Sequence, residues 1–480
     1  MTTVDRGLFV GGTWSPGERR TDVRDPATGE VVGSTAVATP AEVDAAVDAA
    51  RLAFPAWSRA HPDERARILH RAADLVRERV EDITATLTRE QGKPLADSRK
   101  EILFGAEVLD YYAEEGRRLG GDIRQSSRSD ITSLVTWQPL GVVAAIVPWN
   151  YPVDLYTWKI GPALAAGDTV VAKPPVEAPL AVGLVVRCLH DAGLPPGVLA
   201  DLPGGADAGA RLAEHPGVAM LSATASTATG VAIMRAAAPT MKRLTLELGG
   251  QSPFLVLDDA DVEEAAIAAA RRSFSNTGQI CIAVNRILVA DAVADAFVEA
   301  VAEQTRKIRL GHGTSPDVTC GPATTAGVVA TFRDHVLDAR RRGATLVVGG
   351  PDPLPGLGSD LFLAPTVLDR VPAEAVILRE ETFGPAVAVH RVASDDEAVA
   401  LANVVPQGLA AYVFGGDLDR AWAVAERIDA GGVGVNVNDI TDLQAPFGGW
   451  KMSGFGRELG TEGLRSYTQQ RHIRIRRKAR

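Results

Sequence analysis

Hydrophobic positions along this chain follow two different periods, one typical of α-helices and one typical of β-strands. From residue 39 onward apolar positions recur at helical spacing, and residues 39–42 (TPAE) form a helix-start signature with a cap, a proline and an acid. Further helices are expected at 62–90 and 95–115. Residues 1–35 instead hold short apolar pieces broken by glycine and proline, which predict small strands and turns.

From the middle of the chain onward, runs of strand length alternate with helical stretches. Residues 129–138 change to an alternating pattern, which predicts a strand that could be one arm of a hairpin. Further strands are expected at 141–147, 169–172, 198–202, 218–221, 244–247, 286–289, 345–348, 386–389 and 411–414, and helices at 180–192, 262–270, 291–307 and 327–342. This order predicts a parallel sheet with helices on its faces and ligands beyond the carboxyl ends of the strands. A second α/β region is expected from about residue 249, and residues 471–476 favour an edge strand.

The composition is that of an ordinary soluble globular protein. The 480 residues are 46% hydrophobic and 23% charged, which allows two or three domains with sizeable cores. A formal net charge of -10 argues against nucleic acid or an anionic membrane as the main partner. Three cysteines, Cys188, Cys281 and Cys320, form no disulfide framework and indicate a reducing compartment. Neither a signal peptide nor a membrane span is expected, so we expect a cytoplasmic protein.

Common signatures of cofactor, phosphate and metal sites are absent from the sequence. No G-x-G-x-x-G follows a strand and no G-K-[ST] occurs, so the usual dinucleotide fingerprint and the phosphate loop are both missing. The eight histidines lack H-E-x-x-H spacing and no C-x-x-C occurs, so no metal site is expected. A G-x-S-x-G elbow for a serine nucleophile is missing too.

Three residues at strand ends or in loops have side chains suited to covalent chemistry. Cys281 follows a loop that contains glycine and precedes a strand, so it is either a nucleophile or a small buried hydrophobe. Glu247 ends a strand before two glycines and is either a base or a solvated acid. Asn150 is either a helix cap or a donor to a developing oxyanion.

Six motifs in order along the chain decide between these alternatives. They are VPWNYP at 147–152, WKIGPALAAGDTVVAKP at 158–174, LELGGQSP at 246–253, NTGQIC at 276–281, EETFGP at 380–385 and PFGGWKMSGFGRELG at 446–460. Through them the chain resembles the aldehyde dehydrogenase superfamily over nearly its whole length. The resemblance implies an α/β fold with a Rossmann-type cofactor domain, an α/β catalytic domain and a small oligomerisation sheet.

The resemblance also implies a mechanism, the oxidation of an aldehyde to a carboxylic acid with NAD(P)+. Cys281 would be the nucleophile, Asn150 an oxyanion donor, and Glu247 the base that activates water to hydrolyse a thioester. Lys159 and Glu458 would relay the proton, although a surface ion pair explains both residues nearly as well. The rivals are a binding protein with this fold but no activity, and an acylating enzyme that delivers the thioester to coenzyme A.

The cofactor site implied by the resemblance departs from the family pattern. Its residues would be Trp149, Lys173, Val176, Gly205, Ser226, Leu248, Glu381 and Phe383. The glutamate typical of NAD-preferring members falls on Val176, with Glu177 one place later, so NAD is expected as cofactor and NADP is possible. Ala223 and Ala225 replace a usual phenylalanine and glycine, and Gln251 stands where lysine is common.

The substrate tunnel implied by the resemblance is largely aromatic. Its residues would be Phe104, Tyr151, Asp154, Trp158, Ile282 and Phe447, with Leu155, Ser275 and Thr441 beside them. The aromatic side chains favour a flat or aliphatic aldehyde of modest size. Asp154 would either favour a cationic tail, as in an aminoaldehyde, or turn to the tunnel mouth and be hydrated.

The family resemblance implies boundaries for three parts. Residues 1–120 and 140–249 would form the cofactor domain and 250–455 the catalytic domain, whereas 121–139 and 456–480 would form the oligomerisation segments. The expected partners are a small aldehyde and further copies of the chain in a homodimer or homotetramer, with no nucleic acid and no membrane.

Overall fold

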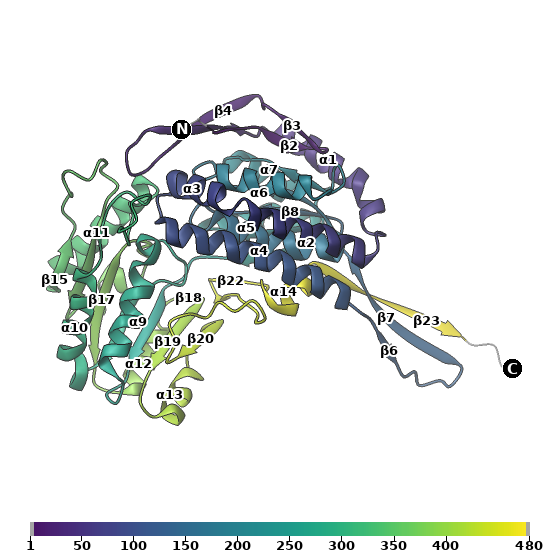
Figure 1. Cartoon of the computed structure of the whole chain (residues 1–480). Coiled ribbons are helices and arrows are strands. Elements are labelled where there is room, and N and C mark those ends of the chain that lie inside the picture. Colours follow the sequence, from purple (N-terminus) through teal and green to yellow (C-terminus); the bar gives the residue numbers. More distant parts are fainter. Residues whose placement is uncertain (1–3, 477–480) are drawn as a thin grey trace.

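Two large sheets organise the chain in the computed structural model, which describes residues 4–476 (Figure 1). The first has the strand order β22-β12-β11-β8-β9-β10-β2-β3. Its central strands are parallel, as the alternating pattern predicts. The strands are β2 (Leu8–Val10), β3 (Thr13–Ser15), β8 (Val142–Ile146), β9 (Thr169–Lys173), β10 (Leu199–Asp201), β11 (Met220–Thr224), β12 (Arg243–Glu247) and β22 (Gly454–Phe455).

Helices from the first half of the chain pack around this sheet. They are α1 (Pro40–Trp57), α2 (Pro62–Glu78), α3 (Val80–Gln91), α4 (Leu95–Arg118), α5 (Pro152–Ala166), α6 (Leu180–Asp191), α7 (Ala206–Glu214) and α8 (Thr227–Ala237). The predicted start of α1 is a full capping box, in which Thr39 and Glu42 satisfy each other's backbone N–H groups. The single helix expected at 62–90 is wrong, because Arg79 leaves helical geometry and divides it into α2 and α3. Apolar spacing continues on both sides of the break, so periodicity could not reveal it.

The second sheet has the order β15-β16-β17-β14-β13-β19-β20. Its strands are β13 (Ser252–Val256), β14 (Val284–Ala290), β15 (Thr345–Gly350), β16 (Ala364–Asp369), β17 (Ala386–Val392), β19 (Ala410–Phe414) and β20 (Gly432–Val435). The helices of this part are α9 (Val262–Phe274), η2 (Ser275–Gly278), α10 (Asp291–Arg306), α11 (Ala326–Arg341), η3 (Val376–Leu378), α12 (Asp395–Asn403) and α13 (Leu418–Ala425). The sequence pattern missed β13, because a proline argues against a central strand, and here Pro253 sits at a register shift.

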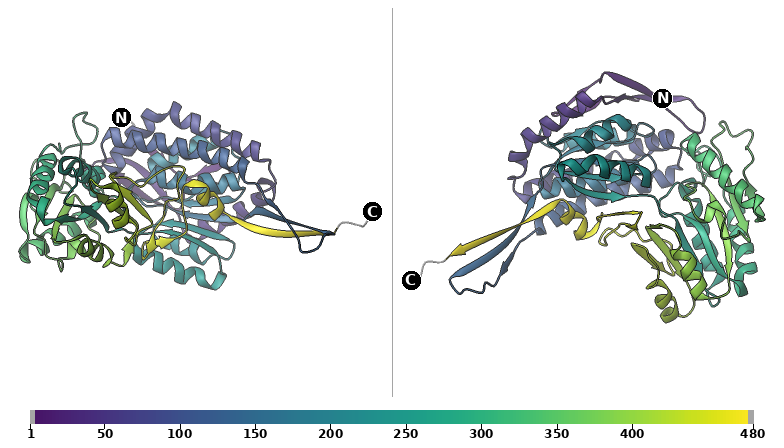
Figure 2. Two further views of the ribbon diagram at one scale, coloured as in Figure 1. Left: turned by 90° about the horizontal axis from the view of Figure 1, so that it is seen from below. Right: turned by 180° about the vertical axis from the view of Figure 1, so that it is seen from behind.

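A slender arm leaves the body of the molecule, and the C-terminal strand runs along it (Figures 1 and 2). It is a sheet of β6 (Asp122–Arg124), β7 (Ile131–Pro139) and β23 (Thr468–Arg476), with β7 in the middle. The strand expected at 471–476 is therefore an edge strand. Smaller sheets pair β1 (Val4–Arg6), β4 (Arg19–Arg24) and β5 (Val31–Val37), and β18 (Gln407–Gly408) with β21 (Trp450–Lys451), while α14 (Gly460–Ser466) precedes β23.

The parallel strands of the first sheet end at one edge. Ile146 pairs with Lys173, Ala223 pairs with Ile146, and Thr224 pairs with Glu247. One cluster of buried apolar side chains reaches from this sheet to the second and includes Trp158, Ile282 and Phe447. The site expected beyond the strand ends is therefore built against a continuous apolar core.

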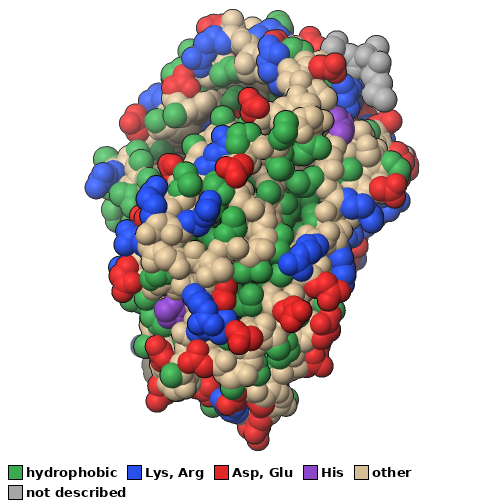
Figure 3. Space-filling view, turned by 90° about the vertical axis from the view of Figure 1, so that its left-hand side faces the viewer, with side chains coloured by type: hydrophobic (Ala, Val, Ile, Leu, Met, Phe, Trp, Pro, Cys, Tyr) green, Lys and Arg blue, Asp and Glu red, His purple; other side chains and the backbone are tan. Residues whose placement is uncertain are grey.

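Acidic and basic side chains are interspersed over the face drawn in Figure 3. Among residues 4–476, no helix combines the length and apolar character needed to cross a membrane.

Candidate active site

Cys281 follows a tightly held turn formed by η2. Asn276 and Thr277 have φ values of 48° and 59°, a left-handed conformation that residues other than glycine rarely adopt. Gly278 also has a positive φ, and a Cβ atom there would lie 2.3 Å from the carbonyl oxygen of Gly384. The turn thus presses against a neighbouring segment and fixes Cys281 in place.

A cavity of about 630 Å³ brings the predicted catalytic and substrate residues together. Cys281, Glu247 and Asn150 line it, although they come from a loop, a strand end and a helix start. All the residues expected in a substrate tunnel also line it: Phe104, Tyr151, Asp154, Leu155, Trp158, Ser275, Ile282, Thr441 and Phe447. One cavity therefore holds a nucleophile, a carboxylate, an amide and an apolar wall.

Asn150 is held by a buried polar network instead of acting as a simple helix cap. Its side-chain Nδ2 donates to the carbonyl oxygen of Gln279 at 3.0 Å. Its own carbonyl accepts from Lys93 Nζ at 2.8 Å and from Asn276 Nδ2 at 3.0 Å. Sequence reasoning missed Lys93, because a lysine between two helices gives no signal of complete burial.

The environment of Cys281 favours the thiol over the thiolate. Burial, and after it the charges of Glu381 and Glu247, raise the pKa of Cys281 to about 12. A positive charge close to the sulfur would lower this pKa and so offset the effect of the two acids. The loop alone therefore does not activate the thiol.

Glu247 ends β12 with its carboxylate in the cavity. Its Oε2 accepts a hydrogen bond from the backbone N–H of Gly449 at 3.2 Å, while its buried Oε1 has no partner among the described residues. Burial, and after it the nearby charge of Glu458, raises the pKa of Glu247 well above its ordinary value. A raised pKa makes the Glu247 carboxylate a stronger base than an ordinary glutamate.

Lys159 and Glu458 form a buried ion pair beside Glu247. Lys159 Nζ lies 2.6 Å from Glu458 Oε1 and donates to Thr224 Oγ1 at 2.6 Å. Both side chains are almost completely buried. The alternative that they form a surface ion pair is therefore wrong. Glu458 lines the cavity, and its Oε2 has no partner among the residues described.

The candidate cofactor residues lie around the edge where the strands of the first sheet end. Lys173 Nζ donates to the Gly204 carbonyl at 2.7 Å, and burial lowers the pKa of this lysine to about 8. Ser226 caps α8, whose first turn carries no acid, so this helix start suits an anion. Gly205 caps α7, and Leu248 follows the end of β12.

The other end of the candidate cofactor site lies next to Cys281. Glu381 accepts from the backbone N–H of Gly250 at 3.2 Å, and burial raises its pKa to about 7. Trp149 and Phe383 meet edge to face, with ring centroids 5.6 Å apart. A cation, an acid-free helix start and a buried carboxylate in this order fit the adenosine, pyrophosphate and ribose groups of a nicotinamide dinucleotide. Within residues 4–476, no group of three or more potential metal ligands occurs.

The residues that depart from the family pattern differ in burial and in hydrogen bonding. Gln251 donates from Nε2 to the carbonyls of Ile377 and Glu380, at 2.8 and 2.9 Å, and so anchors the segment that leads to Glu381. Ala223 is buried in the core of the first sheet. Val176 is half-buried and Glu177 is exposed. Nothing in the structure explains Ala225.

Comparison with known proteins gives consistent matches. The sequence pattern of the aldehyde dehydrogenase family matches residues 14–473. The chain is 40% identical over 484 residues to an NADP(+) succinate-semialdehyde dehydrogenase of Escherichia coli, covering 99% of this chain and 100% of that protein. It is 38% identical over 470 residues to a glutarate-semialdehyde dehydrogenase of Pseudomonas putida, covering 97% of each.

Solved structures of similar proteins superpose over almost the whole chain. A succinate-semialdehyde dehydrogenase from Burkholderia pseudomallei has a TM-score of 0.96 at 39% identity and covers 98% of both chains. A betaine aldehyde dehydrogenase from Staphylococcus aureus in complex with NAD+ has the same TM-score at 34% identity, covering 99% of this chain and 95% of that one.

Proposed function

Because this chain belongs to the aldehyde dehydrogenase family and is an NAD(P)-dependent enzyme that oxidises an aldehyde, we propose that it works by covalent catalysis at Cys281. The observation that carries this proposal is the meeting of Cys281, Glu247 and Asn150 in one cavity. These three side chains supply a nucleophile, a base and a hydrogen-bond donor, which acyl chemistry through a thioester requires.

In the first step the Cys281 thiolate adds to the aldehyde carbon. A C–S bond forms, and the π electrons of the carbonyl move to its oxygen. The second N–H of the Asn150 amide and the backbone N–H of Cys281 are the donors that we assign to this oxyanion. Because the resting pKa of Cys281 is about 12, the proton of the thiol must leave before or during the attack. We assign this proton to solvent water, which leaves Glu247 unprotonated for the hydrolysis step.

Oxidation of the adduct removes a hydride from the former aldehyde carbon. Bound NAD or NADP supplies the acceptor for this hydride and its two electrons. As the hydride leaves, the carbonyl double bond re-forms and a thioester remains on Cys281. Lys173, Ser226 and Glu381 are the residues that we propose hold the cofactor, since they offer a cation, a helix N-terminus and a carboxylate.

Hydrolysis of the thioester completes the cycle. Glu247 takes a proton from water, the water oxygen bonds to the acyl carbon, and the C–S bond breaks to release the acid and the Cys281 thiolate. We propose that the buried pair of Lys159 and Glu458 carries the proton away from Glu247. The unpartnered oxygens of Glu247 and Glu458 are suited to such transfer through water.

Product analysis distinguishes this cycle from its rivals. We expect an aldehyde to reduce NAD(P) with one equivalent of free carboxylic acid formed, in the absence of coenzyme A. An acyl-coenzyme A product that forms only when coenzyme A is added, with no free acid in its absence, would identify the acylating type. A chain that reduces no cofactor with any aldehyde would be the binding protein.

We also propose the setting in which the enzyme works. Three free cysteines suit the reducing cytoplasm. The arm of β6, β7 and β23 is the surface through which we expect copies of the chain to form a homodimer or homotetramer. NAD is the first expected cofactor, and NADP is also possible because Val176 lacks the carboxylate that would repel a 2'-phosphate.

A further inference from the structure

Asp154 is a buried acid that the proposed cycle does not use. It lies in the first turn of α5, lines the cavity and is 9% exposed, so it is not a hydrated group at an open mouth. Its Oδ1 is buried and accepts no hydrogen bond from any described residue. An unpaired buried carboxylate oxygen lowers folding stability, which suggests that its partner is a ligand.

The ordinary task of an aspartate at this position is to cap the helix, and here another residue performs it. Glu101 of α4 extends its Oε1 to the start of α5, where it accepts from the backbone N–H of Val153 at 2.8 Å and of Asp154 at 3.4 Å. Tyr151, the N-cap residue, contributes no side-chain bond. The carboxylate of Asp154 is therefore free of this structural role.

The nearest cation does not neutralise Asp154, because its bonds go elsewhere. Lys93 Nζ lies 2.5 Å from Glu101 Oε2, 2.8 Å from the Asn150 carbonyl and 3.8 Å from the centroid of the Tyr151 ring. Burial, followed by the charge of Glu101, raises the pKa of Asp154 well above its ordinary value, and Lys93 offsets this only partly. When ionised, Asp154 thus leaves an uncompensated negative charge.

The other cations of the cavity wall are exposed or already paired. Lys100 is mostly exposed and lies near Asp97, whereas Arg272 pairs with Asp439 and donates to the Asn438 carbonyl at 2.6 Å. Arg271 is exposed. A substrate carboxylate beside Asp154 would therefore add a second negative charge without a matching cation among the residues described.

Aromatic rings complete the wall around this acid. Trp158 packs edge to face on Phe104 and Phe447, with centroids 6.3 and 5.2 Å away. Ring faces attract cations, most strongly when water is excluded. We propose that Asp154 is a specificity residue that binds a protonated amine at the far end of the substrate, so that this enzyme prefers amino-aldehydes. The inference rests on the proposed function, since it concerns the same cavity.

The first test compares three aldehydes on the purified enzyme. 3-Aminopropanal and butanal have the same number of heavy atoms, and 4-oxobutanoate carries an anionic tail. We expect kcat/KM for 3-aminopropanal to exceed that for butanal at least about tenfold, as for a charged hydrogen bond, with 4-oxobutanoate poorest. A wild-type preference for butanal or 4-oxobutanoate would overturn the inference.

Variants then assign the preference to one side chain. Asp154→Asn should lower kcat/KM for 3-aminopropanal roughly ten- to a hundredfold and change butanal less than about threefold. Glu299→Gln is the matched control, because it removes an exposed acid of α10 outside the cavity wall, and it should leave both substrates unchanged. Equal losses for both substrates in Asp154→Asn would contradict the inference. Asp154→Leu tests the same point should the asparagine variant fold poorly.

A binding measurement without chemistry separates this inference from the proposed function. Calorimetry would compare n-butylammonium and butan-1-ol on the full enzyme. We expect n-butylammonium to bind more tightly and to lose about tenfold or more in Asp154→Asn. If no aldehyde is oxidised but this difference persists, the proposed function fails and the amine site stands. Equal binding of n-butylammonium to the wild type and to Asp154→Asn would overturn the amine site, whether or not the enzyme oxidises aldehydes.

Discussion

At the residue scale, the buried acids around Cys281 decide the resting state of the site. Both the thiol and Glu247 have raised pKa values, because burial and neighbouring carboxylates disfavour their charged forms. Catalysis needs both groups deprotonated. We therefore expect kcat/KM to rise with pH from 7 toward 10, measured with a neutral aldehyde in buffers of constant ionic strength. A profile that falls over this range would contradict the assignment.

The nucleophile is tested by comparing the three cysteines. Cys281→Ala should lower kcat at least about 1000-fold, because no other group forms the thioester. Cys188→Ala and Cys320→Ala should retain most activity, since both thiols are buried away from the cavity wall. Circular dichroism would show that all three variants fold. Near-wild-type turnover in Cys281→Ala would refute the covalent mechanism.

We expect the side chain at position 176 to influence the choice between NAD and NADP. A carboxylate beside the ribose accepts a hydrogen bond from the 2'-hydroxyl and repels a 2'-phosphate, and Val176 lacks one. We expect measurable NADP use by the wild type, and Val176→Glu should shift the kcat/KM ratio toward NAD about tenfold. Val176→Gln, which keeps the size without the charge, is the control. An unchanged ratio in Val176→Glu would assign the preference to Glu177 or another group.

The sequence predicts the catalytic role of a residue when that residue lies in a family motif. The motifs LELGGQSP and VPWNYP imply the roles of Glu247 and Asn150, and the structure places both side chains on the wall of the cavity that holds Cys281. The network behind Asn150 was not found, because Lys93 shows its burial only when α4 and α5 meet. Gln251 was likewise uninterpretable until its bonds to Ile377 and Glu380 were visible.

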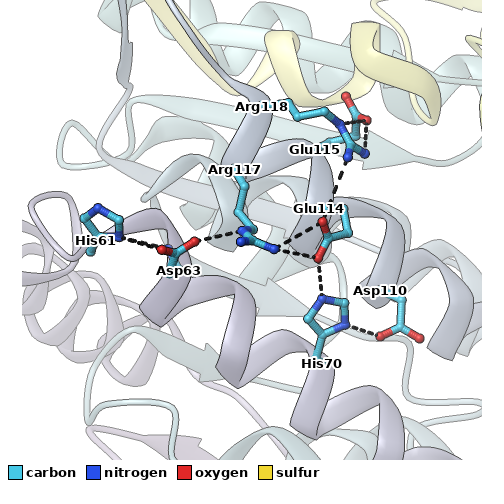
Figure 4. A network of polar contacts seen from close by, with 8 residues as sticks. All are labelled: His61, Asp63, His70, Asp110, Glu114, Glu115, Arg117 and Arg118. Atoms are coloured by element: carbon cyan, nitrogen blue, oxygen red, sulfur yellow. Dashed lines mark hydrogen bonds and ion pairs between the residues drawn. The ribbon is translucent and has the colours of Figure 1, made fainter.

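At the scale of elements, a polar network joins α2 to α4 (Figure 4). His70 of α2 contacts Asp110 at 2.6 Å and Glu114 at 2.8 Å, both on α4. Burial lowers the pKa of His70, but the hydrogen bonds and charges of the two acids outweigh it and raise the pKa above its ordinary value. Protonated His70 therefore ties the two helices together.

The network predicts a pH-dependent contribution to stability. Because the folded pKa is raised, the contribution is fully present below the unfolded pKa and is lost as pH rises through the folded value. His70→Asn should lower Tm by up to about 2 °C at pH 6, as expected for a partly exposed ion pair, and less at pH 9. His61→Asn, which keeps a capping side chain on α2, is the control. A larger loss at pH 9 than at pH 6 would contradict this account.

The ends of helices and strands were predictable where neighbouring residues in the sequence form a recognisable cap or turn. The capping box of Thr39 and Glu42 fixed the start of α1 correctly. The break between α2 and α3 was not predictable, since Arg79 is held by an ion pair to Asp191 at 2.7 Å, far away in sequence. Pro253 hid β13 for a similar reason, because only the register of the assembled sheet shows where a proline is tolerated.

At the scale of the whole molecule, the arm presents an apolar row to its surroundings. Leu134 of β7 pairs with Ile123 of β6 on one side and with Ile473 of β23 on the other. Ile123 is 79% exposed and Ile473 is 40% exposed. An exposed row of this kind on a protruding sheet is typical of an interface.

We expect Ile473→Asp to dissociate the oligomer, because it places a charge at one end of this exposed apolar row. Light scattering after size-exclusion chromatography would report the change in mass. Arg474→Gln, at the neighbouring position of the same strand, should leave the mass unchanged. A wild type that is already monomeric, or an Ile473→Asp variant of unchanged mass, would refute the role of the arm.

The most direct test of the mechanism follows the thioester itself in Glu247→Gln. Glutamine keeps the shape of the side chain but cannot take a proton, so acylation of Cys281 should survive while hydrolysis slows roughly 100- to 10,000-fold. Rapid mixing with an aldehyde and cofactor, followed by mass spectrometry of the quenched protein, measures both steps. We predict a burst of about one reduced cofactor per active site and an acyl mass on Cys281. Loss of both the burst and the adduct, or steady turnover at the wild-type rate, would contradict the account.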